Sequence, residues 1–212
     1  KNCLKKDFCF LLVISLVPYF LRDSITSFLL KPFLSIIASP PTKIYLIEVI
    51  LDIKKPNKIL EIGSAIGFSS SIMALNSDAV IDTIERDLKM ITECKKNHLE
   101  LGLTDRINLI EGDALDTFDI VKDNKYDLIF IDAAKAQYIK FFEMYSPLLN
   151  VDGIILSDNL YFHDLLFTEV NNRDLRQLVR KVGKYNLFLL NHPDFETHIF
   201  KIGDGIGVST KK

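Results

Sequence analysis

The segment "KILEIGSAIGFSS", residues 58–70, decides the fold class that this sequence predicts. Its first five residues are mostly apolar, as in a buried β-strand, and a glycine-containing turn then leads into a helix. Four similar apolar runs follow, separated by polar helical segments: residues 79–84, 106–111, 126–131 and 153–157. Near-continuous apolar strands that alternate with helices indicate a parallel sheet covered by helices on both faces.

The two ends of the chain differ from this central pattern. Near the C-terminus, "FETHIFKI" (195–202) and "GIGVSTKK" (205–212) flank a Gly-Asp-Gly turn and predict an antiparallel hairpin. Residues 1–55 are helical in pattern and include an amphipathic helix that begins at Pro41 and Thr42. We therefore expect an N-terminal helical segment, 1–55, and an α/β domain, 56–212, with a mostly parallel seven-stranded sheet.

The composition fits one compact α/β domain with a sizeable core. The 212 residues are 48% hydrophobic and 25% charged, and the formal net charge of −2 provides no overall positive field for nucleic acid. Three cysteines without metal-ligand spacing, Cys3, Cys9 and Cys94, argue against a disulfide framework or a zinc site. A reducing, cytoplasmic location is the expectation from this cysteine usage.

The apolar run from Phe8 to Val17 follows several lysines and superficially resembles a signal peptide. No small-residue cleavage site follows it, and it is shorter than the roughly 20 apolar residues that span a bilayer. We predict a lid or interface helix, and a homodimer that buries part of residues 8–37. A membrane-associated or secretory segment is the alternative.

The glycine-containing turn favours a cationic ligand. Gly63 and Gly67 allow a sharp turn and a close approach to the backbone, but their spacing is neither G-x-G-x-x-G nor that of a P-loop. An acidic residue before the first glycine, without a phosphate cradle, suits the ammonium and sulfonium groups of S-adenosylmethionine. An ordinary strand-to-helix turn is the structural alternative.

Two further strand ends could complete a nucleoside site. Glu85 ends the second strand, 22 residues after Gly63, where a carboxylate can accept hydrogen bonds from both ribose hydroxyls. Asp113 and Ala114, after the third strand, could recognise the adenine. Each signal is weak when taken alone, and Glu85 could equally be a solvated acid beside Arg86.

The strongest chemical signal is a pair of strands that each end on an aspartate. If strands 126–131 and 153–157 are neighbours, Asp132 and Asp158 lie close together, with Asn159 alongside. Two adjacent carboxylates repel unless a cation sits between them, and three oxygen donors suit a hard cation such as Mg²⁺. Lys135, three residues beyond Asp132, could serve as a general base; a solvent-exposed lysine is the alternative. The four histidines show no ligand spacing, and we expect His98 on a helix surface.

Together, "EIGSAIGFSS", Glu85, "GDA", "IDAAK" and "SDN" resemble the metal-dependent class I O-methyltransferases, the group that contains catechol and caffeoyl-CoA O-methyltransferases. The resemblance covers about residues 36–212, and the C-terminal hairpin is most similar to a bacterial branch that includes tRNA 5-hydroxyuridine methyltransferases. It implies a Rossmann-like methyltransferase fold, S-adenosylmethionine and Mg²⁺. The acceptor it implies is a hydroxyl beside a second oxygen, in a catechol-like phenol or in a wobble uridine of tRNA.

The resemblance also implies roles for individual residues. Those that would bind the cofactor are Glu61, Gly63, Phe68, Ser69, Glu85, Asp113, Ala114 and Asp132. Asp132, Asp158 and Asn159 would ligate the metal, with Lys135 and Asp132 catalytic. A basic segment, residues 169–184, could contact tRNA phosphates or simply be a solvated helix.

Two other functions remain compatible with such a sheet. An NAD(P)-dependent oxidoreductase would share the architecture, although the third glycine of its fingerprint is missing. A non-catalytic nucleotide-binding or membrane-associated module is favoured by the N-terminal run alone.

Overall fold

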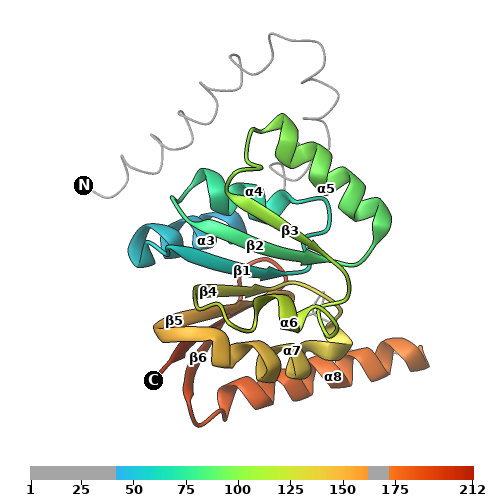
Figure 1. Cartoon of the computed structure of the whole chain (residues 1–212). Coiled ribbons are helices and arrows are strands. Elements are labelled where there is room, and N and C mark those ends of the chain that lie inside the picture. The colour runs from blue at the N-terminus through green and yellow to red at the C-terminus, as the bar shows by residue number, and fades with distance from the viewer. Residues whose placement is uncertain (1–41, 162–171) are drawn as a thin grey trace. The chain divides into compact units, whose positions relative to one another are not determined.

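A seven-stranded mixed sheet organises the part of the chain that the computed structural model describes, residues 42–161 and 172–212 (Figure 1). Its strand order is β3-β2-β1-β4-β5-β7-β6. β1 to β5 pair in parallel, and β7 runs antiparallel to both β5 and β6. The strands are β1 Lys58–Ile62, β2 Val80–Glu85, β3 Ile107–Glu111, β4 Tyr126–Ile131, β5 Leu149–Ser157, β6 Phe195–Phe200 and β7 Ile206–Lys211.

Helices cover both faces of the sheet. Figure 1 shows α3, α4 and α5 on one face and α6, α7 and α8 on the other. Their bounds are α3 Thr42–Lys54, α4 Phe68–Leu75, α5 Leu88–Glu100, α6 Phe118–Val121, α7 Tyr138–Tyr145 and α8 Arg173–Leu190. Two short 3₁₀ helices, η1 Lys135–Gln137 and η2 Ser146–Leu148, flank α7.

The sheet separates two hydrophobic clusters, and successive strand residues enter them alternately. In β4, Leu128 and Phe130 pack with α3 and α4, whereas Ile129 and Ile131 pack with α7 and α8. All four side chains are at most 1% exposed. Because both faces of the strand are buried, the run is almost continuously apolar, as the sequence shows.

The predicted architecture is confirmed in the described residues. The parallel strands and the closing hairpin form where the sequence predicts them, except that β5 begins earlier, at Leu149. α3 contributes Ile47, Ile50 and Leu51 to the core, so residues 42–54 pack with the sheet. The expectations for residues 1–41 lie outside the described residues. Within the described part, no helix is both long and apolar enough to cross a membrane.

Candidate active site

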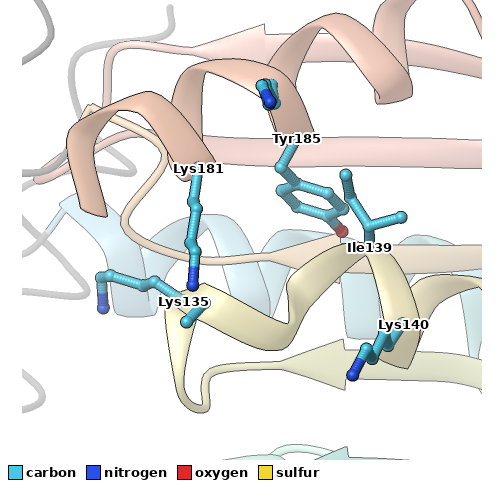
Figure 2. A pocket seen from close by; sticks show the side chains of 7 residues that line it. Lys135, Ile139, Lys140, Lys181 and Tyr185 are labelled. Atoms are coloured by element: carbon cyan, nitrogen blue, oxygen red, sulfur yellow. The ribbon is translucent and has the colours of Figure 1, made fainter. Parts of the chain in front are cut away.

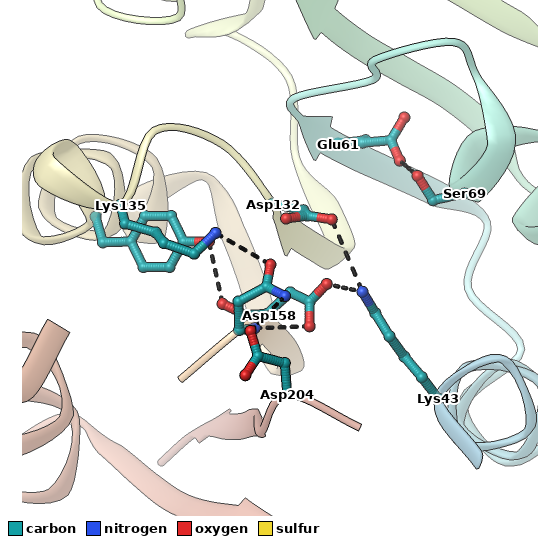
Figure 3. A network of polar contacts seen from close by, with 9 residues as sticks. Lys43, Glu61, Ser69, Asp132, Lys135, Asp158 and Asp204 are labelled. Atoms are coloured by element: carbon teal, nitrogen blue, oxygen red, sulfur yellow. Dashed lines mark hydrogen bonds and ion pairs between the residues drawn. The ribbon is translucent and has the colours of Figure 1, made fainter. Parts of the chain in front are cut away.

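The carboxyl ends of β4 and β5 bring the two predicted metal-binding aspartates together (Figure 3). Ile131 pairs with Ser157, and the Asp158 amide donates a hydrogen bond of 3.0 Å to the Ile131 carbonyl. The condition on which the predicted closeness of Asp132 and Asp158 depended, that these two strands are neighbours, is therefore met. Asp132 and Asp158 are the first residues after the paired positions, so their side chains leave the sheet side by side.

Asp158 is almost completely buried, at 1% exposure. Its Oδ1 accepts a hydrogen bond of 2.7 Å from the Asn159 amide, and its backbone carbonyl accepts one of 3.1 Å from the Tyr138 hydroxyl. Asn159 itself has a positive φ of 57°, a conformation that asparagine tolerates better than most residues. These two hydrogen bonds fix the turn after β5, and with it the positions of the Asp158 carboxylate and of Asn159.

Lys43, the second residue of α3, extends its ammonium between the two aspartates (Figure 3). Its Nζ forms an ion pair with Asp158 Oδ2 and lies 3.8 Å from Asp132 Oδ2. Burial lowers the pKa of Lys43, and the charge of Asp132 opposes that shift. The role of Lys43 could not be predicted from the sequence, because nothing in "TKIYLI" indicates that its first turn faces a strand end far along the chain.

Lys135 approaches the same group from η1. Its Nζ donates a hydrogen bond of 3.2 Å to Asn159 Oδ1, and Asn159 Nδ2 donates one of 3.2 Å to Asp204 Oδ2. Asp204 lies in the turn between β6 and β7 and was not predicted. The structure therefore places Asp132, Lys135, Asp158 and Asn159 in one polar group, together with the unpredicted Lys43 and Asp204.

The glycine-containing turn packs directly against this group. Gly63 has a φ of 95°, and a Cβ at this position would lie 2.2 Å from the carbonyl oxygen of Asp132. The absence of a side chain is needed here because the Asp132 backbone fills the space, a reason that differs from the predicted approach of a ligand. The contact joins the predicted cofactor turn to the predicted metal site.

Glu61, in β1, lies beneath that turn and is fully buried. Its carboxyl group accepts hydrogen bonds from the hydroxyls of Ser69, the second residue of α4, and Thr83, the latter at 2.5 Å. Burial raises the pKa of Glu61 to about 7, while these hydrogen bonds oppose the shift. Phe68, the first residue of α4, is partly buried beside Ser69.

Glu85, at the end of β2, is bound by backbone amides. Its Oε1 accepts hydrogen bonds of 2.9 Å from the amides of Arg86 and Asp87, and its Oε2 accepts one of 2.8 Å from Ala65. Ala65 has a positive φ of 47°, which turns its amide toward the carboxylate. A carboxylate offers about four acceptor positions, and three are used here, so one position remains at Oε2, where the sequence led us to expect two ribose hydroxyls.

Asp113 and Ala114 follow β3 at the same edge of the sheet. Asp113 accepts hydrogen bonds from the Leu115 amide (2.9 Å) and from Arg86 Nη1 (2.7 Å), and these lower the pKa of Asp113. Ala114 is 7% exposed, and its carbonyl accepts a hydrogen bond from the Tyr145 hydroxyl. Arg86 therefore links the strand ends that carry Glu85 and Asp113.

The expected surface position of His98 is wrong, because His98 is 2% exposed. Its Nε2 lies 3.0 Å from the Ser70 hydroxyl, and a Cβ on Gly67 would lie 2.5 Å from the same nitrogen. The 3- and 4-residue spacing of Ile91, Cys94 and His98 places all three on the buried face of α5. That spacing was the sequence signal for burial.

The oxygen donors at the β4 and β5 ends are of the chemical type that a hard cation binds. Within residues 42–161 and 172–212, no cluster of three or more His, Cys, Asp or Glu side chains has metal-site geometry. The predicted set contains two carboxylates and one amide, and the Lys43 ammonium already serves as a cation between the carboxylates. Carboxylate and amide oxygens are ligands that Mg²⁺ accepts.

A pocket of about 200 Å³ lies between η1, α7 and α8 (Figure 2). Its lining contains four lysines, Lys135, Lys140, Lys181 and Lys184, together with Ala136, Ile139 and Tyr185. Lys135 belongs both to this pocket and to the polar group around Asn159. The pocket thus combines an apolar floor with positive charge next to the candidate site.

The chain is similar in sequence to known O-methyltransferases. The sequence profile of the O-methyltransferase family matches residues 19–212, so the chain belongs to that family. A flavonoid 3′,5′-methyltransferase from Vitis vinifera is 29% identical over 76% of this chain and 73% of its own length. A caffeoyl-CoA O-methyltransferase from Populus kitakamiensis is 26% identical over 76% of this chain and 72% of its own length.

Solved structures extend the similarity to the fold. A Staphylococcus aureus protein, provisionally assigned as a caffeoyl-CoA O-methyltransferase, has a TM-score of 0.80 and 37% identity over 99% of this chain and all of its own. A Podospora anserina methyltransferase solved with SAH bound has a TM-score of 0.72 and 27% identity, with 80% of this chain and 78% of that one covered. The protein is a class I, S-adenosylmethionine-dependent O-methyltransferase of the caffeoyl-CoA type.

Proposed function

We propose that the enzyme methylates a hydroxyl that has a second oxygen beside it, and that a divalent cation, Mg²⁺ in the first instance, assists the reaction. The observation that supports this is the pair of carboxylates on adjacent strand ends, which already share one positive charge. The cation would be held by Asp132, Asp158 and Asn159. Once bound, it would lower the pKa of the acceptor hydroxyl and orient its oxygen.

The remaining chemistry falls to side chains around this group. S-adenosylmethionine supplies the methyl group from its sulfonium. Lys135 Nζ would take the proton of the acceptor hydroxyl, since it lies at hydrogen-bonding distance from the proposed ligand Asn159. Gly63 is in contact with the Asp132 backbone. This contact would fix the position of the cofactor relative to the acceptor.

The cofactor contacts are proposed from the same strand ends. Glu85 Oε2 would accept a hydrogen bond from a ribose hydroxyl. Asp113 and Ala114 would lie beside the adenine. Glu61 would act from below, by holding Ser69 and hence the start of α4. Phe68 would complete the pocket wall at the first turn of that helix.

A small phenol with adjacent oxygens is the first candidate for the acceptor. It is supported by the names of the similar plant enzymes, which act on a flavonoid and on caffeoyl-CoA. A catechol-like phenol also offers the cation two oxygens at once, as the proposed ligand set requires.

A tRNA wobble 5-hydroxyuridine is the second candidate, since it offers an equivalent oxygen pair. It is favoured by the basic residues of α8, Arg173, Arg176 and Arg180, and by the four lysines of the pocket, one of which, Lys135, belongs to the candidate site. Phosphates are the natural partners of such a surface.

The deciding experiment is transfer of labelled methyl groups from S-adenosylmethionine to a catechol panel and to bulk tRNA, each with and without EDTA. Labelling of a catechol that is lost when EDTA is added would support the first candidate. Labelling of tRNA that is lost when EDTA is added would support the second. Asp158→Asn should abolish the EDTA-sensitive activity while cofactor binding persists. Activity that is indifferent to EDTA would contradict the proposed cation.

A further inference from the structure

Lys43 occupies the position between the two aspartates that the proposed cation would take. Its ammonium forms an ion pair with Asp158 Oδ2 and lies 3.8 Å from Asp132 Oδ2 (Figure 3). Apart from this ion pair, Asp158 Oδ2 has no polar partner among the described residues. The ammonium is therefore the charge partner of this buried oxygen.

The two aspartates differ in how strongly they depend on that partner. The Asp158 side chain is 1% exposed, whereas that of Asp132 is 33% exposed and has access to water. A buried carboxylate without a partner is costly, so Asp158 in particular requires a positive charge beside it. A divalent cation and an ammonium cannot both occupy the space, because like charges at such distances repel.

The Lys43 side chain can move its ammonium away from the two aspartates. It is the second residue of α3, its side chain is 34% exposed, and it reaches the site by a flexible four-carbon stem. α3 itself stays anchored through Ile47, Ile50 and Leu51 in the core. The ammonium could therefore turn to water without a movement of the helix.

We propose that Lys43 is an internal competitor for the cation site: its ammonium neutralises Asp132 and Asp158 when no metal is bound, and a divalent cation must displace it. This inference rests on the proposed metal-assisted function. It predicts that the native enzyme binds divalent cations more weakly than the same oxygen ligands would without Lys43. Lys43 then sets the metal concentration at which the enzyme becomes active.

The test is direct titration of the full chain with Mn²⁺, by the electron paramagnetic resonance signal of the free ion, and with Mg²⁺ by calorimetry. Lys43→Met and Lys43→Gln should each bind the cation at least about tenfold more tightly than the native protein, equivalent to about 1.4 kcal/mol. Lys43→Arg, which keeps the charge, should remain close to native. Lys54→Met is the matched control, since Lys54 lies on the same helix but contacts the Asp152 carbonyl.

Thermal unfolding supplies a second measurement that does not depend on activity. In EDTA, Lys43→Met should melt below the native protein because Asp158 loses its partner, and Mg²⁺ should raise its Tm more than it raises the native Tm. The glutamine variant, which can still donate a hydrogen bond to Asp158, keeps the test usable if the methionine variant folds poorly.

The outcomes separate the two proposals. Suppose that the native protein, Lys43→Met and Lys43→Gln bind the cation equally well, and that Asp158→Asn does not bind it. This result would contradict the proposal that Lys43 competes with the cation, and it would support the metal site. No cation binding in any variant, with methyl transfer unaffected by EDTA, would overturn the metal site and the competition together.

Discussion

At the scale of single residues, the candidate site is a set of carboxylates whose environments differ. Glu61 is fully buried among hydroxyls, Glu85 is held by three backbone amides, and Asp158 is buried against an ammonium. Each environment makes a different property measurable. Glu61 should affect the pH dependence of stability, Glu85 the affinity for the cofactor, and Asp158 the affinity for divalent cations.

Glu85 should contribute to cofactor affinity through Oε2. Glu85→Ala is expected to weaken S-adenosylmethionine binding by about 1.5–3 kcal/mol, as for a hydrogen bond to a charged group. Calorimetry would measure this, with Glu111→Ala as control, since Glu111 occupies the paired position in β3 but contacts Lys95.

The Glu85 side chain also holds the Ala65 amide, so the loss could arise from the turn instead of the ribose. A double-mutant cycle with a cofactor analogue that lacks the ribose hydroxyls separates the two causes. Additive losses from the mutation and the analogue would contradict the ribose contact.

Lys135 should matter for turnover and not for binding. Lys135→Met keeps the bulk of the side chain but cannot accept a proton, so kcat should fall by roughly 10²–10⁴ while cofactor affinity stays near native. The loss should shrink for acceptors that are already ionised at the assay pH. Lys122→Met, at an exposed lysine paired with Asp119, is the control. Native kcat in Lys135→Met on a neutral hydroxyl would refute the role as base.

Glu61 should make stability depend on pH. Burial raises its pKa from an ordinary 4.5 to about 7, so the folded protein binds more protons than the unfolded chain between these values. The stabilisation is complete below about pH 4.5 and is lost as the pH rises through about 7. Denaturant unfolding from pH 5 to 8 should show native stability falling relative to Glu61→Gln by about 1–3 kcal/mol. A constant difference would contradict the raised pKa.

At the scale of elements, the turn between β1 and α4 is held in place by contacts behind it. Gly63 lies against the Asp132 backbone, and Gly67 lies against His98 and Cys94 of α5. Burial raises the pKa of the Cys94 thiol to about 11, so the group behind Gly67 is a neutral packing surface. The turn between β1 and α4 is therefore coupled to β4 on one side and to α5 on the other.

This coupling predicts different outcomes for two glycine substitutions. Gly63 and Gly102 both have positive φ, of 95° and 66°, but an added Cβ would collide at Gly63 and meets nothing within 4 Å at Gly102. Gly102→Ala should cost only the backbone strain, about 1–2 kcal/mol. Gly63→Ala should cost about 1–3 kcal/mol more, from the collision with Asp132, and should also abolish cofactor binding. Denaturant unfolding and calorimetry would show this, and equal costs would contradict the packing role.

At the scale of the whole molecule, the expected homodimer concerns residues outside the described ranges. The sequence of residues 8–37 is strongly apolar, and we predict that part of it is buried against a second copy of the chain. Light scattering of the full chain at micromolar concentration should give twice the monomer mass. A monomer would refute the proposal, and solubility that depends on detergent would favour membrane association instead.

The sequence by itself determined the parallel sheet and, once the two strands are neighbours, the closeness of Asp132, Asp158 and Asn159. Strands buried on both faces must be almost continuously apolar, and residues that follow adjacent parallel strands must emerge at one edge. These are consequences of local pattern and topology. They could be predicted without knowledge of any side-chain contact.

Only the tertiary structure decided what surrounds those residues. Lys43 reaches the aspartates from α3, Asp204 reaches Asn159 from the β6–β7 turn, and the space beside Gly63 is filled by the Asp132 backbone. None of these contacts leaves a periodic or local signal, because each joins elements that are distant in sequence and meet only when the sheet is assembled. The charge balance of the site is therefore a property of the folded chain.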